Sequence, residues 1–116
     1  MEAIRRGDII RVGLDPTAGS EQAGERPVLV VSPDAVNKHS PVILVAPITS
    51  KKTERVYRTE ALIEPPDGGL GMRSKVLLLQ LRSVDKSRIT DYYGRVSPDV
   101  MNRVDDALKI VVGLVL

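Results

Sequence analysis

The chain has 116 residues, of which 42% are hydrophobic and 28% are charged, and its formal net charge is +2. This length suits one hydrophobic core, so we expect a single domain over residues 1–116. The absence of Cys and the presence of one His exclude disulfides, thiolate nucleophiles, thiolate metal sites and His-pair metal motifs. No apolar run approaches the roughly 18 to 20 residues of a membrane-spanning helix, and no signal peptide pattern follows the first residues. These features favour a cytoplasmic protein that binds no membrane, metal or cofactor.

The first half of the chain predicts short strands separated by polar loops. Three strands are expected there, over residues 8–14, 27–32 and 42–48. In the first of them Ile10, Val12 and Leu14 share one face, whereas the second is apolar enough to be buried on both faces. Residues 15–26 are rich in Gly, Pro, Ser and Glu and predict a long loop, which in a compact domain is usually functional or mobile. Residues 33–41 predict a polar connection.

The second half continues this pattern and then changes period. Three more strands are expected over residues 60–64, 74–81 and 89–93. Residues 49–59 predict a basic, solvated loop, and residues 65–69, with two Pro and two Gly, predict a turn. Ser97 and Pro98 are typical of a helix start, and the apolar residues that follow at helical spacing are Val100, Val104, Ala107, Leu108 and Val111.

These elements indicate a mainly β fold of the α+β type, in which a small, strongly bent antiparallel sheet or open barrel is followed by a C-terminal helix. The last residues, 111–116, are unusually apolar. We expect them to pack on the sheet or on a second copy of the chain, because exposed apolar patches of this kind are uncommon.

Arg26 is the first candidate for chemistry, because it stands where the long loop meets a buried strand. Its guanidinium offers a planar fork that matches phosphate and stays charged at physiological pH. The alternative is a structural role in which Arg26 pairs with Glu21 or Glu25 and holds the loop.

Thr49 and Ser50 end the third predicted strand. Their hydroxyls could contact a phosphate or a ribose, or could simply bond to local backbone. Basic residues gather in two windows, which are either solvated faces or contacts to a polyanion: Lys51, Lys52, Arg55 and Arg58, and then Arg73, Lys75, Arg82, Lys86 and Arg88. Contacts to phosphates would make binding weaken steeply with salt.

Gln80 interrupts the apolar centre of the fifth predicted strand. A buried Gln must be hydrogen-bonded, so it either satisfies backbone groups or points into a site where it could read a base edge. His39 is expected on the surface, and the stacking platforms for bases are limited to Tyr57, Tyr92 and Tyr93.

Several of these motifs, in this order, resemble the MazF/PemK family of toxin endoribonucleases. They are Gly-Asp-Ile-Ile at residues 7–10, Asp-Pro-Thr-Ala-Gly-Ser-Glu-Gln-Ala-Gly-Glu-Arg-Pro at residues 15–27, Pro-Ile-Thr-Ser at residues 47–50, and Gln-Leu-Arg-Ser-Val-Asp-Lys-Ser-Arg at residues 80–88. The resemblance covers essentially the whole chain. It implies an SH3-like barrel that works as a homodimer and forms the toxin of a type II toxin–antitoxin system.

The resemblance also implies an activity, namely sequence-specific, metal-independent cleavage of single-stranded RNA. The 2′-hydroxyl attacks the adjacent phosphate and leaves 2′,3′-cyclic phosphate and 5′-hydroxyl ends. By motif position, Arg26 and Thr49 become the catalytic pair, and Glu21 either takes a proton or braces Arg26. The residues implied to contact RNA or shape the site are Ser20, Gln22, Ser50, Lys51, Lys52, Gln80 and Arg82. The implied protein partner is a cognate antitoxin whose C-terminal segment lies in the RNA groove.

Two features depart from the family pattern: Leu79 stands where members often carry an acidic residue, and the first loop lacks a Phe found in some members. An alternative from another class is a non-catalytic toxin of the CcdB type, which binds DNA gyrase. The apolar end of the chain favours it, but the motifs around Arg26 and Thr49 do not. A third possibility is a small nucleic-acid-binding module without turnover.

Overall fold

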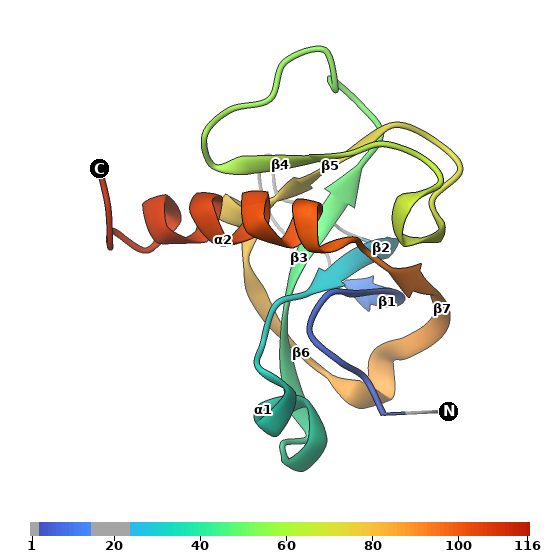
Figure 1. The fold of residues 1–116 in the computed structure, drawn as a ribbon. Helices are drawn as coiled ribbons and strands as arrows, with labels where there is room; N and C mark the ends of the chain where they lie inside the picture. The colour runs from blue at the N-terminus through green and yellow to red at the C-terminus, as the bar shows by residue number, and fades with distance from the viewer. Residues whose placement is uncertain (1–2, 15–23) are drawn as a thin grey trace.

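The computed structural model describes residues 3–14 and 24–116, and within them the chain forms a bent antiparallel sheet crossed by a C-terminal helix (Figure 1). The strands are β1 (Asp8–Leu14), β2 (Gly24–Val30), β3 (Val42–Thr49), β4 (Glu60–Ile63), β5 (Ser74–Leu77), β6 (Arg82–Asp85) and β7 (Ile89–Arg95). The helices are α1 (Asp34–His39) and α2 (Pro98–Val111), and the short 3₁₀ turns are η1 (Asp67–Gly69), η2 (Leu78–Gln80) and η3 (Lys86–Arg88). The main path of the sheet is β4-β5-β3-β2-β1-β7, with β6 paired to β3. The mainly β architecture with a C-terminal helix is therefore confirmed.

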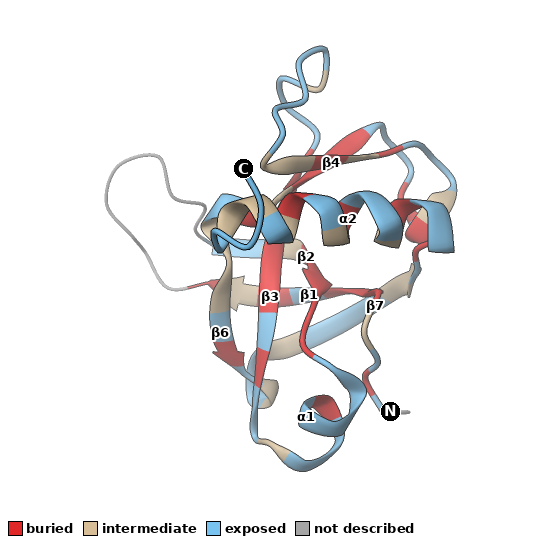
Figure 2. Cartoon of the chain, turned by 60° about the vertical axis from the view of Figure 1, so that its left-hand side comes forward, coloured by how far each residue is buried: buried red, intermediate tan, exposed pale blue. Residues whose placement is uncertain are grey.

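The sheet is buried on both faces at Asp8–Ile10 of β1 and Val28–Val30 of β2, and each face belongs to a different apolar cluster. Ile9 and Leu29 face the cluster that α2 covers, whereas Ile10, Val12 and Val28 face a second cluster enclosed by the curled strands. This alternation confirms the period-2 pattern predicted for the first strand and the two-sided burial predicted for the second. The curled sheet covers one face of these stretches and α2 covers the other, and their buried residues are red in Figure 2.

The helix α2 begins where the sequence predicts. The Ser97 hydroxyl oxygen accepts a hydrogen bond from the backbone N–H of Val100 at 3.3 Å, which caps the first turn. The buried residues of α2 are Val100, Val104 and Ala107, which lie on the sheet side. The amphipathic pattern of residues 100–111 is therefore confirmed.

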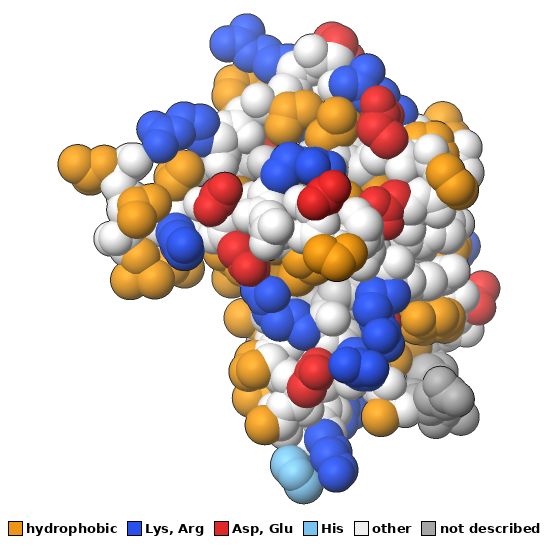
Figure 3. Space-filling view, in the orientation of Figure 1, with side chains coloured by type: hydrophobic (Ala, Val, Ile, Leu, Met, Phe, Trp, Pro, Cys, Tyr) orange, Lys and Arg blue, Asp and Glu red, His pale blue; other side chains and the backbone are white. Residues whose placement is uncertain are grey.

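The apolar residues after α2 do not pack on the sheet. Leu114 and Leu116 are 75% and 104% exposed, and Val112 and Val115 are about half exposed. Hydrophobic side chains accordingly gather around the C-terminus on the left of Figure 3. Of the two expected placements for this segment, packing on the sheet is wrong.

The predicted fifth strand over residues 74–81 is also wrong, because it is broken after Leu77. Val76 pairs with Ile48, and Arg82 pairs with Val45. The chain therefore advances six residues from Val76 to Arg82 while β3 advances only three. The three extra residues form the 3₁₀ turn η2, after which β6 continues along the same edge of β3. A long apolar run hides such an offset, because register is decided by the partner strand.

Further differences from the prediction concern β2, the connection after it and β7. β2 starts at Gly24 instead of Pro27, because residues 24–27 pair with β1. The polar connection over residues 33–41 contains α1, whose buried Asn37 donates to the carbonyl oxygen of Ser32 at 2.8 Å. β7 continues through Gly94, where a Cβ would lie 2.9 Å from the carbonyl oxygen of Gly68, so this glycine serves close packing and does not end the strand.

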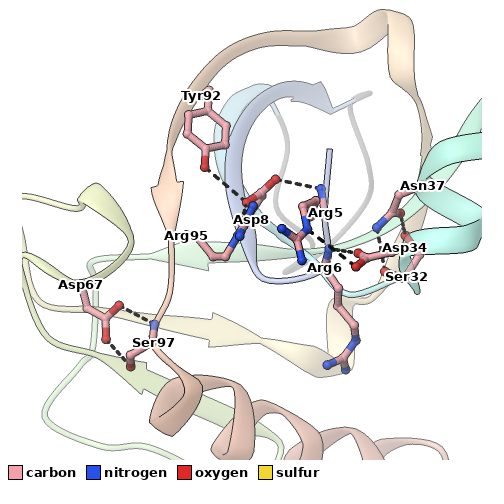
Figure 4. Close-up of polar contacts among 10 residues, drawn as sticks. All are labelled: Arg5, Arg6, Asp8, Ser32, Asp34, Asn37, Asp67, Tyr92, Arg95 and Ser97. Carbon is pink, nitrogen blue, oxygen red and sulfur yellow. Dashed lines mark hydrogen bonds and ion pairs between the residues drawn. The ribbon is translucent and has the colours of Figure 1, made fainter. Parts of the chain in front are cut away.

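A buried carboxylate fixes the start of the sheet (Figure 4). Asp8, 2% exposed, accepts from the Arg5 backbone N–H at 2.8 Å, from Arg95 Nε at 3.0 Å and from the Tyr92 hydroxyl at 3.3 Å. The hydrogen bond to Asp8 raises the pKa of the Arg95 guanidinium. Asp8 therefore joins the N-terminal segment to β7.

Candidate active site

A cavity of about 240 Å³ opens where β2 begins and β3 ends, beside the segment that follows η1. Its described lining residues are Arg26, Pro27, Ile48, Thr49, Ser50, Leu70, Gly71, Met72, Ser74 and Tyr93. Four residues that the sequence singled out are thus brought to one place, namely Arg26, Thr49, Ser50 and Tyr93.

Strand register explains why Arg26 and Thr49 meet. β2 and β3 are antiparallel, with Val28 opposite Pro47. Two residues further along each strand, this register brings Arg26 opposite Thr49. Residues opposite each other on neighbouring strands project to the same face of the sheet. The two side chains therefore reach the cavity from neighbouring strands.

Arg26 is half-buried, and its Nε atom is buried without a hydrogen-bond partner among the described residues. The neighbouring Glu25 is engaged elsewhere, because it pairs with Arg11 Nε at 3.5 Å and accepts from the Thr90 hydroxyl at 2.9 Å. Of the expected structural alternative, the pair between Arg26 and Glu25 is not formed, and Glu21 lies outside the described residues. A buried donor without a partner is costly in a folded protein, so the Arg26 Nε, which has no partner among the described residues, suits an acceptor that enters the cavity.

Thr49 is 8% exposed, and its Oγ1 accepts a hydrogen bond from the Lys51 backbone N–H at 3.1 Å. A threonine hydroxyl can donate one hydrogen bond while it accepts another. The bond from Lys51 therefore orients the oxygen and leaves the hydroxyl hydrogen for an acceptor in the cavity.

The opposite wall was missed at the sequence level, and it comes from Leu70, Gly71 and Met72 together with Ser74. The turn at residues 65–69 was the available signal, but a turn does not reveal what its exit will face. The wall is held by Gly69, whose φ is +78° and whose Cβ position is occupied by the Tyr93 carbonyl group. Only glycine combines this conformation with so close an approach.

Four of the remaining predicted site residues are described, and they lie outside the cavity. Lys51 and Lys52 are exposed on the loop that follows Thr49. Gln80 ends η2 and is half-buried, which corrects the assumption of a buried strand glutamine, and Arg82 begins β6. None of these four is among the described lining residues of the cavity. Ser20, Glu21 and Gln22 lie outside the described residues.

On the face of the molecule that Figure 3 shows, the described charged residues do not form one continuous patch. On the face in Figure 3, Lys and Arg side chains alternate with Asp and Glu. Lys75, assigned to a basic window from the sequence, is instead 4% exposed and pairs with Glu60 at 2.9 Å. His39 is exposed, as predicted.

Residues 3–14 and 24–116 include no group of three or more His, Asp or Glu side chains placed to hold a metal ion. Within the same ranges, no helix has the length and apolar character needed to cross a membrane.

Comparison with known proteins connects this site to a family. Residues 5–112 match the family described as the PemK-like, MazF-like toxin of type II toxin–antitoxin systems. The chain is 38% identical to endoribonuclease EndoA of Bacillus subtilis (strain 168) over 112 residues, which cover 97% of each protein.

Solved structures share the fold. An endoribonuclease in complex with its cognate antitoxin from Mycobacterial species superposes with a TM-score of 0.83 at 28% identity and covers 98% of this chain and 99% of its own. MazF from Deinococcus radiodurans superposes with a TM-score of 0.81 at 30% identity, over 97% of this chain and 99% of its own. With the family match extending from the N-terminal segment to the end of α2, the chain belongs to the PemK-like, MazF-like toxins of type II toxin–antitoxin systems.

Proposed function

We propose that the protein is a sequence-specific endoribonuclease that cleaves single-stranded RNA without a metal. The observation that carries the proposal is the buried Nε of Arg26, which has no partner among the described residues, in the same open cavity as the oriented hydroxyl of Thr49. A cation and a hydroxyl donor on rigid strands suit a phosphodiester group, whose oxygens accept hydrogen bonds and carry negative charge. The similarity to endoribonuclease EndoA supports the same activity.

In the proposed reaction the substrate supplies its own nucleophile. The ribose 2′-oxygen forms a bond to phosphorus while the bond from phosphorus to the 5′-oxygen breaks, which leaves a 2′,3′-cyclic phosphate and a 5′-hydroxyl. One proton leaves the 2′-hydroxyl and one reaches the departing 5′-oxygen. The protein therefore has to position the RNA and stabilise the extra negative charge on the phosphorus oxygens.

We assign this stabilisation to Arg26, whose guanidinium stays charged and offers several donors, and we assign orientation of the phosphate to Thr49. Glu21 takes the proton from the 2′-hydroxyl or braces Arg26. The proposed RNA contacts around this centre are Ser20, Gln22, Ser50, Lys51, Lys52, Gln80 and Arg82.

We further propose that the toxin acts as a homodimer and is inhibited by a cognate antitoxin whose C-terminal segment occupies the RNA groove. Support comes from the Mycobacterial endoribonuclease, which was solved in complex with its cognate antitoxin. The gyrase-binding alternative is not favoured, because the family match is to the PemK-like, MazF-like toxins.

The experiment is cleavage of a long RNA by the pure protein in EDTA, with the new ends identified by ligation that requires a 5′-hydroxyl. Wild type should give discrete fragments, and Arg26→Ala should lose about 10²–10³-fold in rate, the range for removing one charge-stabilising group. Arg103→Ala is the matched control, because Arg103 is exposed on α2 and donates to the Leu62 carbonyl oxygen at 3.1 Å. Intact RNA with wild type, or equal rates for Arg26→Ala and wild type, would reject the proposal.

A further inference from the structure

The cross-strand row that contains Arg26 and Thr49 continues onto a third strand. Thr49 is paired with Lys75 across the antiparallel contact of β3 and β5, so both side chains project to the same face of the sheet. Lys75 is nevertheless 4% exposed, because the loop over residues 50–59 covers it. A buried lysine therefore pairs across the strands with the candidate catalytic threonine.

The ammonium of Lys75 binds the loop directly. It donates to the Arg55 carbonyl oxygen at 2.9 Å and to Glu60 Oε1 at 2.9 Å. The same Glu60 oxygen accepts from the Tyr57 backbone N–H at 3.0 Å. The loop backbone is thus held at two points, one by each member of the ion pair.

The side chains of the two anchored residues, Arg55 and Tyr57, face solvent. The Arg55 guanidinium lies 4.9 Å from the centroid of the Tyr57 ring, and Lys75 Nζ lies 5.7 Å from it. Tyr57 is 53% exposed, and Arg55 is exposed as well. Stacked arginine and tyrosine side chains are groups on which nucleic acid bases stack and to which phosphates bind.

This ion pair differs from the others in the described chain by its burial. Both of its side chains are mostly buried, at 5% and 13% exposed, whereas Arg73 and Glu64, which pair just outside β5 and β4, are 49% and 60% exposed. In the pair of Arg95 with Asp8 only the aspartate is buried. Burying two charges is costly unless their hydrogen bonds are satisfied, and here the loop backbone supplies the additional partners. The pair and the loop conformation therefore depend on each other.

We propose that Lys75 and Glu60 are positioning residues that fix the 50–59 loop beside Thr49 and so set which RNA sequences are cut. They act through the loop, which presents Arg55 and Tyr57 to nucleotides next to the scissile phosphate. The inference rests on the proposed ribonuclease function and adds the device that determines its selectivity.

The test uses the full-length protein with Lys75→Met and Glu60→Leu combined. Replacing both members of a buried pair by apolar residues avoids a stranded charge and often preserves stability, so this variant should fold. It removes the two loop anchors and leaves Arg26 and Thr49 in place.

The main readout is the distribution of cut sites on a long RNA, mapped by sequencing the 5′-hydroxyl ends. We expect the preference of the variant for the wild-type sites over other sites to fall by about tenfold, the size of effect that one or two lost contacts produce. On a short RNA that carries a preferred wild-type site, KM should rise while kcat changes by less than about threefold.

A second readout does not depend on RNA cleavage. The loop contains four trypsin sites, after Lys51, Lys52, Arg55 and Arg58. The anchored loop of the wild type should resist trypsin, and the double variant should be cut there at least about tenfold faster, because proteolysis follows the population of open loop.

The matched control is Arg6→Met combined with Asp105→Leu, which removes a 2.7 Å ion pair between the N-terminal segment and α2. It should leave both the cut-site pattern and loop proteolysis unchanged. Arg55→Ala keeps the ion pair and the backbone carbonyl but removes the presented guanidinium, so it should change the cut-site pattern even if the double variant fails to fold.

The outcomes separate the two proposals. If wild type cuts no RNA, the proposed function fails and the selectivity inference fails with it. If wild type cuts RNA but the folded double variant, or Arg55→Ala, keeps the wild-type distribution of sites, only the inference is overturned.

Discussion

The carboxylate of Asp67 accepts two hydrogen bonds from Ser97 (Figure 4). Asp67 Oδ1 accepts from the Ser97 backbone N–H at 2.8 Å, and Oδ2 accepts from the Ser97 hydroxyl at 2.6 Å. The same hydroxyl oxygen caps α2 through the N–H of Val100. The segment after η1 supplies Leu70, Gly71 and Met72 to the cavity. The helix cap and this cavity wall are therefore held by one carboxylate.

We predict that Asp67→Ala lowers the free energy of unfolding by about 1–3 kcal/mol, because it leaves a part-buried backbone donor without its partner and weakens the helix cap. The midpoint of thermal unfolding, measured by circular dichroism, should fall by several degrees. Asp99→Ala is the control, since Asp99 lies in the same first turn but is exposed and contributes only about 0.3–1 kcal/mol through the helix dipole. Equal losses for the two variants would contradict the assigned role of Asp67.

Thr49→Val should abolish most RNA cleavage while the fold is kept. Valine has nearly the same shape but has no hydroxyl, so we expect a loss of about 10²–10³-fold in kcat. Thr49→Ser keeps the hydroxyl and should stay within about tenfold of wild type. Single-turnover cleavage of one RNA, with melting curves for all three proteins, measures this. An active, folded Thr49→Val protein would exclude a hydroxyl role.

Asp85 gives an expectation for acid pH. Its carboxylate accepts from the Ser87 backbone N–H at 2.8 Å, and this bond, helped by the Ser87 side chain and by the charge of Arg88, lowers the pKa of Asp85. A lowered pKa in the folded state stabilises the protein above the unfolded pKa of about 3.9, and this contribution is lost as pH falls through the folded value.

Asp85→Asn should therefore be less stable than wild type at pH 7, and the difference should shrink as pH falls below about 4. Thermal melts of both proteins between pH 7 and pH 3 measure it. A difference that stays constant across this range would show that ionisation of Asp85 does not contribute.

The exposed apolar tail provides a test of the proposed homodimer. Val112, Leu114, Val115 and Leu116 leave a continuous apolar surface after α2. Such surfaces usually mark an interface. Leu114→Asp should shift the protein from dimer to monomer in light scattering at micromolar concentration. Val56→Asp is the control, because Val56 is an exposed apolar residue of the 50–59 loop instead of the tail. A wild-type monomer at that concentration would remove the prediction.

Local sequence patterns predicted much of the fold. The alternation of Ile10, Val12 and Leu14, the two-sided burial of β2 and the start of α2 at Ser97 each depend on residues close together in the chain. The three-residue offset at η2 could not be predicted in this way, because it exists only relative to β3. The helix α1 was missed because its polar residues lack an apolar stripe and its Asn37 is satisfied by Ser32.

For the candidate site, too, the sequence predicted some features and only the structure showed the others. Arg26 and Thr49 were identified from the sequence through motif resemblance, and their shared cavity follows from the register of β2 and β3. The wall formed by residues 70–72 depends on the packing of Gly69 against Tyr93. The sequence placed Lys75 in a window of basic residues, whereas in the structure it is buried beneath the 50–59 loop.

The composition that excludes thiolate and His-pair chemistry was fixed by the sequence alone, as were the charge, the periodic strands and the capped helix. The tertiary structure decided which cations are buried, which donor lacks a partner among residues 3–14 and 24–116, and which loop covers the strand beside Thr49. The physical reason is that periodicity and capping are local properties of the chain. Burial and hydrogen-bond satisfaction, in contrast, depend on segments that meet only after folding.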